Sequence, residues 1–178
     1  MDIERARINI ENAIGSNSYY LFKNIFPDTP KWDNFIDHLN FEFHNPPSEN
    51  QHSDQEVMIN GVSKRNHFYL SVRNPTIEFY PKLKEVIDFF NIVMEEGSGG
   101  VSSFINFVGN ENPVGSHPDR RDTVYWQCIG NSEWVVGEKQ ESIILSPGDV
   151  IFVPKGVFHH VITKEPRAAI ALAYKQMV

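Results

Sequence analysis

The chain has 178 residues, of which 40% are hydrophobic and 12% aromatic, enough to form the core of one ordinary domain. Its formal net charge of -7 argues against a general affinity for nucleic acid or for anionic membrane surfaces. The single cysteine, Cys128, has no partner for an internal disulfide and is expected to be a buried strand residue. The first residues, MDIERARINIENAIG, lack the apolar core of a signal peptide, and no later run reaches membrane-spanning length, so we expect a soluble, cytoplasmic protein.

The first hundred residues are predicted to form a cover of helices and one hairpin. The aromatic run SYYLFKNIF (18–26) favours a strand, and TPKWDNFIDHLN (29–40) favours a short helix. The run QEVMINGVSKRNHFYLSV (55–72) predicts two strands around Asn60-Gly61, a dipeptide suited to a tight hairpin turn. The apolar residues of PKLKEVIDFFNIVMEEG (81–97) recur at helical spacing, so one face of that helix must pack on a core.

From Val101 onward the chain changes to short β-rich runs, each closed by Gly, Pro, Asn or charged turn residues. The runs are VSSFINFVG, TVYWQCIG, EWVVG, ESIILS, DVIFV, HHVIT and AAIALAY. Strands so short and evenly punctuated indicate a sandwich, jelly roll or barrel rather than alternating βαβ units. We therefore expect a mainly β, single-domain chain over residues 1–178, with a cover over 1–100 and barrel strands over 101–178.

Three residues in this β-rich part form a candidate metal site. His117 and Asp119 are two apart at the start of a strand, so alternation places both side chains on one face. His159 follows about forty residues later, at the start of another strand. Two imidazoles and one carboxylate that leave positions open are the ligand set expected of Fe(II) oxygenases. The alternative is a loop pair, His117 with Asp119, and an unrelated core histidine at His159.

The second of these stretches carries a specific motif. GDVIFVPKGVFH matches the second cupin motif, Gly-(x)5-Pro-x-Gly-(x)2-His, at Gly148, Pro154, Gly156 and His159. Residues 115–174 thus resemble the cupin superfamily, and the His-x-Asp form of the first motif is similar to that of the JmjC-like 2-oxoglutarate oxygenases. The resemblance implies a double-stranded β-helix in which Fe(II) and 2-oxoglutarate support hydroxylation or demethylation of a substrate. Homodimers are common among such proteins.

The sequence departs from these families at two positions. Thr123 stands where ordinary cupins have a fourth ligand, a glutamate, which opens the metal to chelation. HPDRRDTVYWQCIGNSEW also resembles the JmjC-like run that ends in a Gly-x-x-x-Trp turn, but Ser132 replaces the Lys or Arg that usually binds the far carboxylate of 2-oxoglutarate. Arg167, at the start of the final strand, is the candidate replacement, because a guanidinium binds a carboxylate through two parallel hydrogen bonds. The alternative is an exposed turn residue in KEPR.

Strand alternation extends the candidate pocket. If His117 and Asp119 point into the barrel, the inward positions that follow are Thr123, Tyr125 and Gln127. Val124, Trp126 and Cys128 would then face the other layer. Successive inward polar groups are costly without partners, so a ligand cavity is favoured over a hydrated barrel mouth. Ser103 and Asn106 on the preceding run are weaker candidates for the same pocket, and His160 is expected to point away from it.

The remaining signals concern the substrate and the alternative functions. Arg120, Arg121, Asp122 and Lys155 lie on turns near the predicted site, where they either contact a charged substrate or are solvated. The loop FHNPPSENQHS (43–53) is either a lid that faces the substrate or an ordinary surface loop. We expect a small molecule or an exposed side chain as substrate. Ser132 keeps open a cupin metalloenzyme that uses no 2-oxoglutarate, such as a dioxygenase or an isomerase. A third possibility is a non-catalytic cupin that binds a small molecule, against which the open three-ligand set counts.

Overall fold

The structure is a computed structural model that describes residues 2–44, 57–59, 62–65, 69–73, 77–107, 110–111 and 115–174. Its helices are α1 (Ile3–Gly15), α2 (Trp32–His44) and α3 (Leu83–Val93). Its strands are β1 (Tyr20–Phe22), β2 (Val57–Ile59), β3 (Val62–Arg65), β4 (Tyr69–Arg73), β5 (Gly100–Asn106), β6 (Asn110–Glu111), β7 (His117–Pro118), β8 (Asp122–Ile129), β9 (Ser132–Val136), β10 (Glu141–Leu145), β11 (Val150–Val153), β12 (Phe158–Thr163) and β13 (Arg167–Tyr174).

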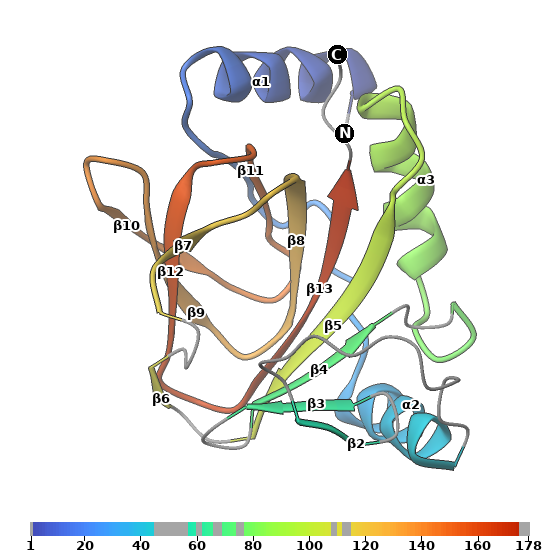
Figure 1. Ribbon diagram of the computed structural model, residues 1–178. Helices are drawn as coiled ribbons and strands as arrows, with labels where there is room; N and C mark the ends of the chain where they lie inside the picture. Colours follow the sequence, from blue (N-terminus) through green and yellow to red (C-terminus); the bar gives the residue numbers. More distant parts are fainter. Residues whose placement is uncertain are drawn as a thin grey trace.

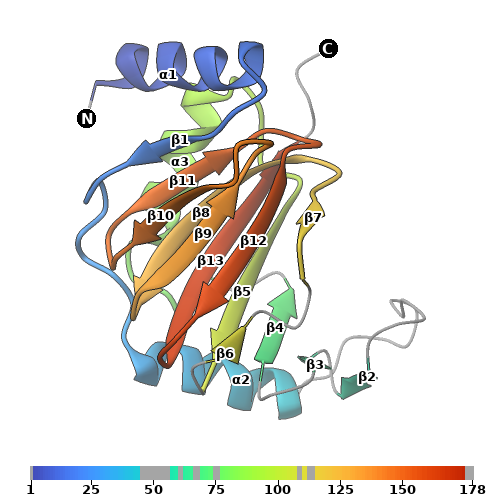
Figure 2. The ribbon, with the colours of Figure 1, turned by 90° about the vertical axis from the view of Figure 1, so that its left-hand side faces the viewer.

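Two antiparallel sheets face each other and enclose a barrel (Figures 1 and 2). The large sheet has the order β1-β11-β8-β13-β5-β4-β3-β2. The small sheet has the order β10-β9-β12-β6, with β7 also paired to β12. Strands distant in sequence are thus neighbours, as in a jelly roll. The mainly β fold predicted from the sequence, a double-stranded β-helix with a few covering helices, is confirmed.

The amino-terminal strands belong to the large sheet instead of forming a separate cover. β1 pairs with β11, and β4 pairs with β5, which attaches β3 and β2 to the same sheet. The predicted hairpin is present as β2 and β3, while its turn, Asn60-Gly61, lies outside the described residues. The second half of the predicted run divides into two strands, β3 and β4.

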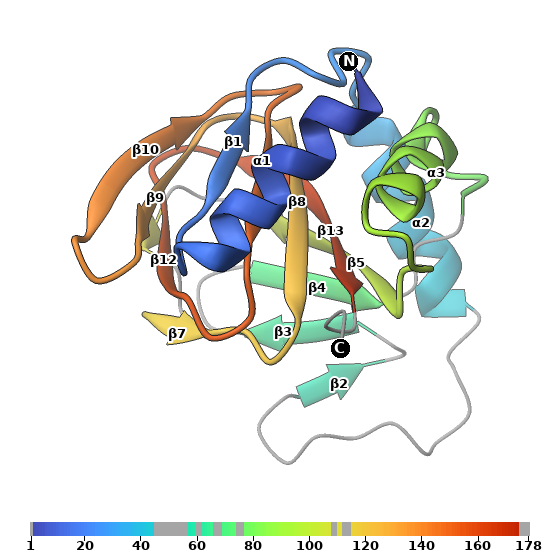
Figure 3. The ribbon, with the colours of Figure 1, turned by 90° about the horizontal axis from the view of Figure 1, so that it is seen from above.

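The helix α1 was not predicted, because its segment reads as polar and mixed in charge. Asp2 caps it by accepting a hydrogen bond from the Glu4 backbone N–H, and Ala6, Ile10 and Ala13 form its buried face. Because alanine is small and only weakly hydrophobic, this face did not stand out in the sequence as an apolar stripe. Helix α1 contacts α3, and Figure 3 shows it crossing in front of β1 and β8 towards α3. None of the helices in the described residues is long and apolar enough to cross a membrane.

The large sheet separates two apolar cores, and alternation along β8 assigns its side chains to them. Val124, Trp126 and Cys128 belong to the outer core, which packs against the helices, as predicted. Tyr125 belongs to the inner core, inside the barrel. The Cys128 thiol is buried, and burial raises its pKa, so this cysteine behaves as a small apolar residue.

The turn between β8 and β9 approaches the start of β13 closely. Gly130 has a φ of +65°, and a Cβ on it would lie 2.3 Å from the Pro166 carbonyl oxygen and 3.3 Å from the Arg167 Cα. A side chain at this position must therefore displace the backbone that carries Arg167. Gly137, in the turn between β9 and β10, has a φ of +72°, but nothing lies within 4 Å of its ideal Cβ.

These two glycines give a matched test of the close approach. Gly130→Ala is expected to lower the free energy of unfolding by roughly 2–4 kcal/mol, because left-handed strain adds to a backbone clash. Gly137→Ala carries only the strain and should cost about 1 kcal/mol. Urea denaturation of both variants measures the difference, and equal losses would contradict a special role for the contact between Gly130 and the start of β13.

Candidate metal centre

His117, Asp119 and His159 converge at one end of the barrel. The pairing of β7 with β12 places His117 directly opposite His159, and Asp119 follows β7 after Pro118. One ligand atom from each residue lies within 4.8 Å of the other two. The Asp119 carboxylate lies between the imidazoles, with Oδ1 at 3.9 Å from His117 Nε2 and Oδ2 at 3.8 Å from His159 Nε2.

Backbone carbonyls orient both imidazoles. His117 Nδ1 lies 3.0 Å from the Gly115 carbonyl oxygen, and His159 Nδ1 lies 3.2 Å from that of Val157. A carbonyl only accepts, so each Nδ1 carries a proton and each Nε2 is left facing Asp119. Burial lowers the pKa of His159, although the Asp119 carboxylate opposes this, and the neutral imidazole that results is the form that binds metals.

The exposure of the three side chains would leave a bound metal accessible to further ligands. His117 and Asp119 are each 34% exposed, whereas His159 is 5% exposed. The group is therefore open on one side and closed by the barrel on the other. Two imidazole nitrogens and one carboxylate match the facial ligand set of non-haem Fe(II), and the chemistry of these donors fits such an ion.

Thr123, the first predicted wall residue, supports the carboxylate ligand. It begins the inward-facing series of β8, and its Oγ1 donates to Asp119 Oδ2 over 3.0 Å. A hydroxyl in this place fixes the carboxylate rotamer and leaves the other oxygen for a metal. Thr123 stands where ordinary cupins have a fourth ligand, and here it orients Asp119, the second candidate ligand.

Arg167 lies inside the barrel. It is 1% exposed, so the alternative of an exposed turn residue is excluded. Its Nη1 donates to the Tyr125 hydroxyl, its Cζ lies 5.8 Å from the centre of the Tyr125 ring, and its Nε is buried without a hydrogen-bond partner. No carboxylate among the described residues forms an ion pair with it. A guanidinium that is buried without a charged partner lowers the stability of the protein, and a bound anion would offset much of that cost.

Tyr125 and Gln127, the other two predicted wall residues, differ in the hydrogen bonds that they have left for a ligand. Burial raises the pKa of Tyr125, while Arg167 opposes this; the phenol accepts from the guanidinium and keeps its own hydrogen to donate. The amide of Gln127 is already engaged: Nε2 donates to the carbonyls of Ile129 and Gly130, and Oε1 accepts from Ser132 Oγ over 2.8 Å. Gln127 therefore stiffens the wall around the turn, and Ser132 belongs to that network.

Trp134 is a wall residue that the sequence reasoning did not assign. Its ring stacks on His159 with centroids 5.4 Å apart, and it meets Tyr125 edge-on at 4.7 Å. Its Nε1 donates to Ser132 Oγ over 3.1 Å. The signal was available, because alternation from the inward Ser132 along β9 places Trp134 in the barrel. It connects the candidate ligand His159 with Tyr125, the residue that contacts Arg167.

Ser103 and Asn106, the weaker candidates for the pocket, lie on opposite faces of the large sheet. On β5, Phe104 belongs to the inner core and Ile105 to the outer one. Asn106 therefore faces the barrel, as suggested from the sequence. Ser103 faces the helices, beside Tyr80, so its assignment to the pocket was wrong. Ser103 and Asn106 are three residues apart on one strand, so alternation places their side chains on opposite faces.

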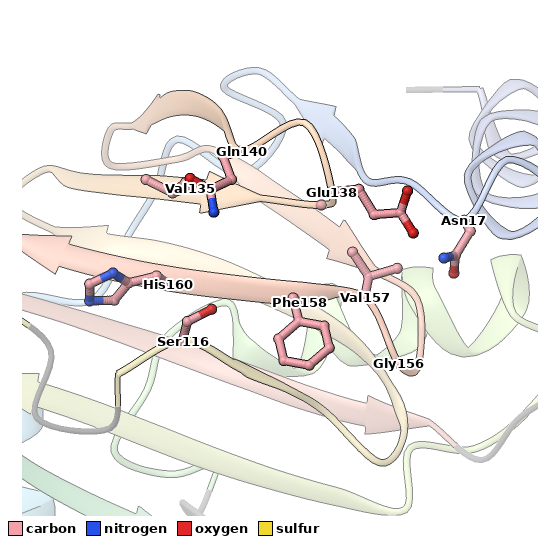
Figure 4. Close-up of a pocket in the computed structure, with 10 residues that line it drawn as sticks. Asn17, Ser116, Val135, Glu138, Gln140, Gly156, Val157, Phe158 and His160 are labelled. Carbon is pink, nitrogen blue, oxygen red and sulfur yellow. The ribbon is translucent and has the colours of Figure 1, made fainter.

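His160 points away from the centre, as predicted. It lines a groove of about 550 Å³ on the outer face of the small sheet, together with Val135 and Phe158 (Figure 4). Figure 4 shows the three side chains on the surface strands, with Ser116 at the edge of the same groove. Because His159 and His160 alternate, the groove and the metal centre occupy opposite faces of β12.

The charged residues on the nearby turns have structural contacts. Asp122 is buried, and its Oδ1 accepts a hydrogen bond from the Lys155 backbone N–H over 2.7 Å. This bond ties the turn after β11 to the start of β8. Arg121 Nη1 donates to the Gly99 carbonyl over 3.3 Å, and Arg120 is exposed. A contact of these residues with substrate stays a prediction.

Comparison with known proteins finds solved structures with a similar fold. No family model matches the sequence, and no curated protein matches it. Among solved structures, Escherichia coli YcfD is similar with a TM-score of 0.63 and 14% identity, over 94% of this chain and 53% of that one. The ribosomal oxygenase YcfD in complex with cobalt and 2-oxoglutarate gives a TM-score of 0.64 and 15% identity, over 96% and 52%. Its complex with cobalt and succinic acid gives 0.61 and 16%, over 96% and 52%.

The chain thus spans about half the length of these similar structures. At identities of 14% to 16% the likeness shows a shared fold. It does not by itself carry over an activity or a substrate.

The hydrogen bond between Thr123 and Asp119 predicts an effect on metal affinity. Thr123→Val keeps the shape of the side chain but removes the donor, and we expect about tenfold weaker Fe(II) or Co(II) binding, because the carboxylate loses its fixed orientation. Thr123→Ser retains the hydroxyl and should restore most of the affinity. Anaerobic titration followed by calorimetry measures both, and a valine variant that binds as tightly as the wild type would contradict the role of Thr123.

Proposed function

We propose that the chain is an Fe(II)- and 2-oxoglutarate-dependent oxygenase that hydroxylates or demethylates a small molecule or an exposed side chain. The observation that carries the proposal is the presence of two complementary features in one barrel. His117, Asp119 and His159 form an open metal-ligand set, and the interior also holds the buried guanidinium of Arg167 without a carboxylate partner.

A 2-oxo acid with a second carboxylate matches both features. Its oxo and carboxylate oxygens can chelate a metal at the three-ligand set, while its far carboxylate can bind Arg167 and the Tyr125 hydroxyl. The inward positions of β13 beyond Arg167 carry three alanines, Ala169, Ala171 and Ala173. Small side chains thus line this strand from Arg167 to the neighbourhood of Thr123.

The assignment of Arg167 explains how the site can bind a carboxylate although Ser132 replaces the usual cation. In JmjC-like oxygenases a cation is expected at the position of Ser132, but here that residue accepts from Trp134 and donates to Gln127. The cation comes from the opposite sheet, at the start of β13. Two of the similar structures contain cobalt, one with 2-oxoglutarate and one with succinic acid, which supports this kind of ligand for a barrel of this shape.

Each residue of the site has a distinct part in the proposed reaction. When bound, iron would supply the oxidative chemistry that couples decarboxylation of the 2-oxo acid to attack on the substrate. Asp119 and the two imidazoles hold the ion, Thr123 orients Asp119, and Trp134 packs against His159 to keep that side of the centre dry. The exposed sides of His117 and Asp119 leave an approach for the substrate.

The test is metal-dependent turnover of 2-oxoglutarate. With Fe(II), ascorbate and oxygen, the full chain is expected to convert 2-oxoglutarate to succinate slowly even without its substrate. Asp119→Ala should abolish succinate formation, because one of the three ligands is lost. Arg167→Lys should mainly raise the KM for 2-oxoglutarate, because an ammonium group cannot form the two parallel hydrogen bonds of a guanidinium. Succinate measured by mass spectrometry gives the rates.

His160→Ala is the matched control for this experiment. It removes an imidazole next to a proposed ligand, but its side chain lies on the outer face of the sheet, so succinate formation should be unchanged. A wild-type chain that binds Fe(II) tightly and yet forms no succinate with any candidate substrate supplied would contradict the proposal. That result would favour a cupin metalloenzyme that uses no 2-oxo acid.

A further inference from the structure

Two buried polar atoms without partners belong to neighbouring residues of the large sheet. Arg167 Nε and Asn106 Oδ1 are both buried and have no hydrogen-bond partner. The pairing of β13 with β5 places Arg167 directly opposite Asn106. A buried donor and a buried acceptor that lie side by side without bonding each other are costly, since each has lost its water.

Both side chains face the interior of the barrel. On β5, Phe104 packs in the inner core and Ile105 in the outer one, so Asn106 points inward. Arg167 points inward too, because it contacts Tyr125 of the inner core. Directly opposite residues in an antiparallel pair have Cβ atoms about 5 Å apart, so one small group can contact both side chains.

The surroundings favour an anionic oxygen as that group. Asn106 is 2% exposed and Arg167 is 1% exposed, so bulk water does not solvate the guanidinium. A carboxylate oxygen can accept from Arg167 and, with the Asn106 amide turned so that Nδ2 faces it, from Asn106 as well. Which way an amide group is turned is decided by its partners, so an arriving anion sets the orientation.

We propose that Asn106 is a second anchor for the carboxylate that Arg167 binds, and thereby a specificity-determining residue of the site. The inference rests on the proposed function, because 2-oxoglutarate is the carboxylate considered. Tyr125 completes the group by donating its hydrogen to the same anion. A dicarboxylate 2-oxo acid then gains contacts from three strands, β5, β8 and β13, whereas a monocarboxylate 2-oxo acid gains none of them.

The aspartate variant tests this arrangement, because it attaches a carboxylate where the ligand's carboxylate would bind. In ligand-free protein, Asn106→Asp should raise the Tm by about 2–4 °C, since it supplies an anion to a guanidinium that is already out of water. The same variant should no longer be stabilised by 2-oxoglutarate, because its own carboxylate occupies the anchor. Co(II) affinity should not change. A gain in stability that accompanies a loss of ligand binding is not what a merely structural asparagine produces.

Three further variants complete the experiment. Asn12→Asp introduces the same charge on the exposed face of α1, away from the anchor. It should not change the response to 2-oxoglutarate, and it should not raise the Tm, because a negative charge in the last turn of a helix is unfavourable. Asn106→Ala removes the anchor without adding a charge and should weaken 2-oxoglutarate binding about 10- to 100-fold. Each variant is measured by thermal unfolding of the full chain with Co(II), with and without 2-oxoglutarate. Asn106→Asp is also measured in an Arg167→Met background, where its gain in Tm should disappear.

The outcomes separate the inference from the proposed function. The inference is overturned if Asn106→Asp lowers the Tm, or raises it equally with and without Arg167. It is also overturned if Asn106→Ala binds 2-oxoglutarate like the wild type. If 2-oxoglutarate fails to stabilise the wild type but Asn106→Asp gains stability only with Arg167 present, the proposed function fails. In that case Asn106 and Arg167 stand as an anchor for another carboxylate.

Discussion

The antiparallel pairing of β7 with β12 is the constraint on which the candidate site depends. It places His117 opposite His159, although 41 residues separate them in sequence, and it brings Asp119 to the point where both Nε2 atoms are directed. Backbone carbonyls then fix the tautomer of each ring. Few side-chain contacts are needed to build the centre, because the strand register and the alternation of side chains do most of the positioning.

The second constraint is electrostatic and lies deeper in the barrel. A jelly roll of this size has an interior that apolar side chains can fill, and Val136, Leu145, Ile151 and Val161 do so on one part of its wall. Another part carries Arg167, Asn106 and Tyr125, whose polar atoms are incompletely satisfied by the protein. Retaining a guanidinium there costs stability, and a barrel selected only for folding would replace it with an apolar residue. Its presence favours a ligand.

The parts of this structure that the sequence predicted follow from strong local signals. Short punctuated strands, the turn glycines and the period-two pattern of β8 were sufficient for the jelly roll and for the sides of Val124 and Tyr125. His117, Asp119 and His159 followed from motif spacing. What was missed has separate causes. Ser103 and Asn106 are three residues apart, so alternation alone excluded one of them from the pocket. The small residues Ala6 and Ala13 made the buried face of α1 hard to recognise, and the hydrogen bond between Gln127 and Ser132 depends on how β8 and β9 meet.

The measurement that tests the central claim most directly is anaerobic titration of the full chain with Fe(II) and 2-oxoglutarate, followed by visible absorption. If the three-ligand set binds iron and a 2-oxo acid chelates it, a metal-to-ligand charge-transfer band should appear only when both are present. The band should weaken when Arg167 is replaced by alanine, because the far carboxylate loses its anchor. Iron binding without any such band would contradict the account, since the open positions of the metal would then not accept a 2-oxo acid.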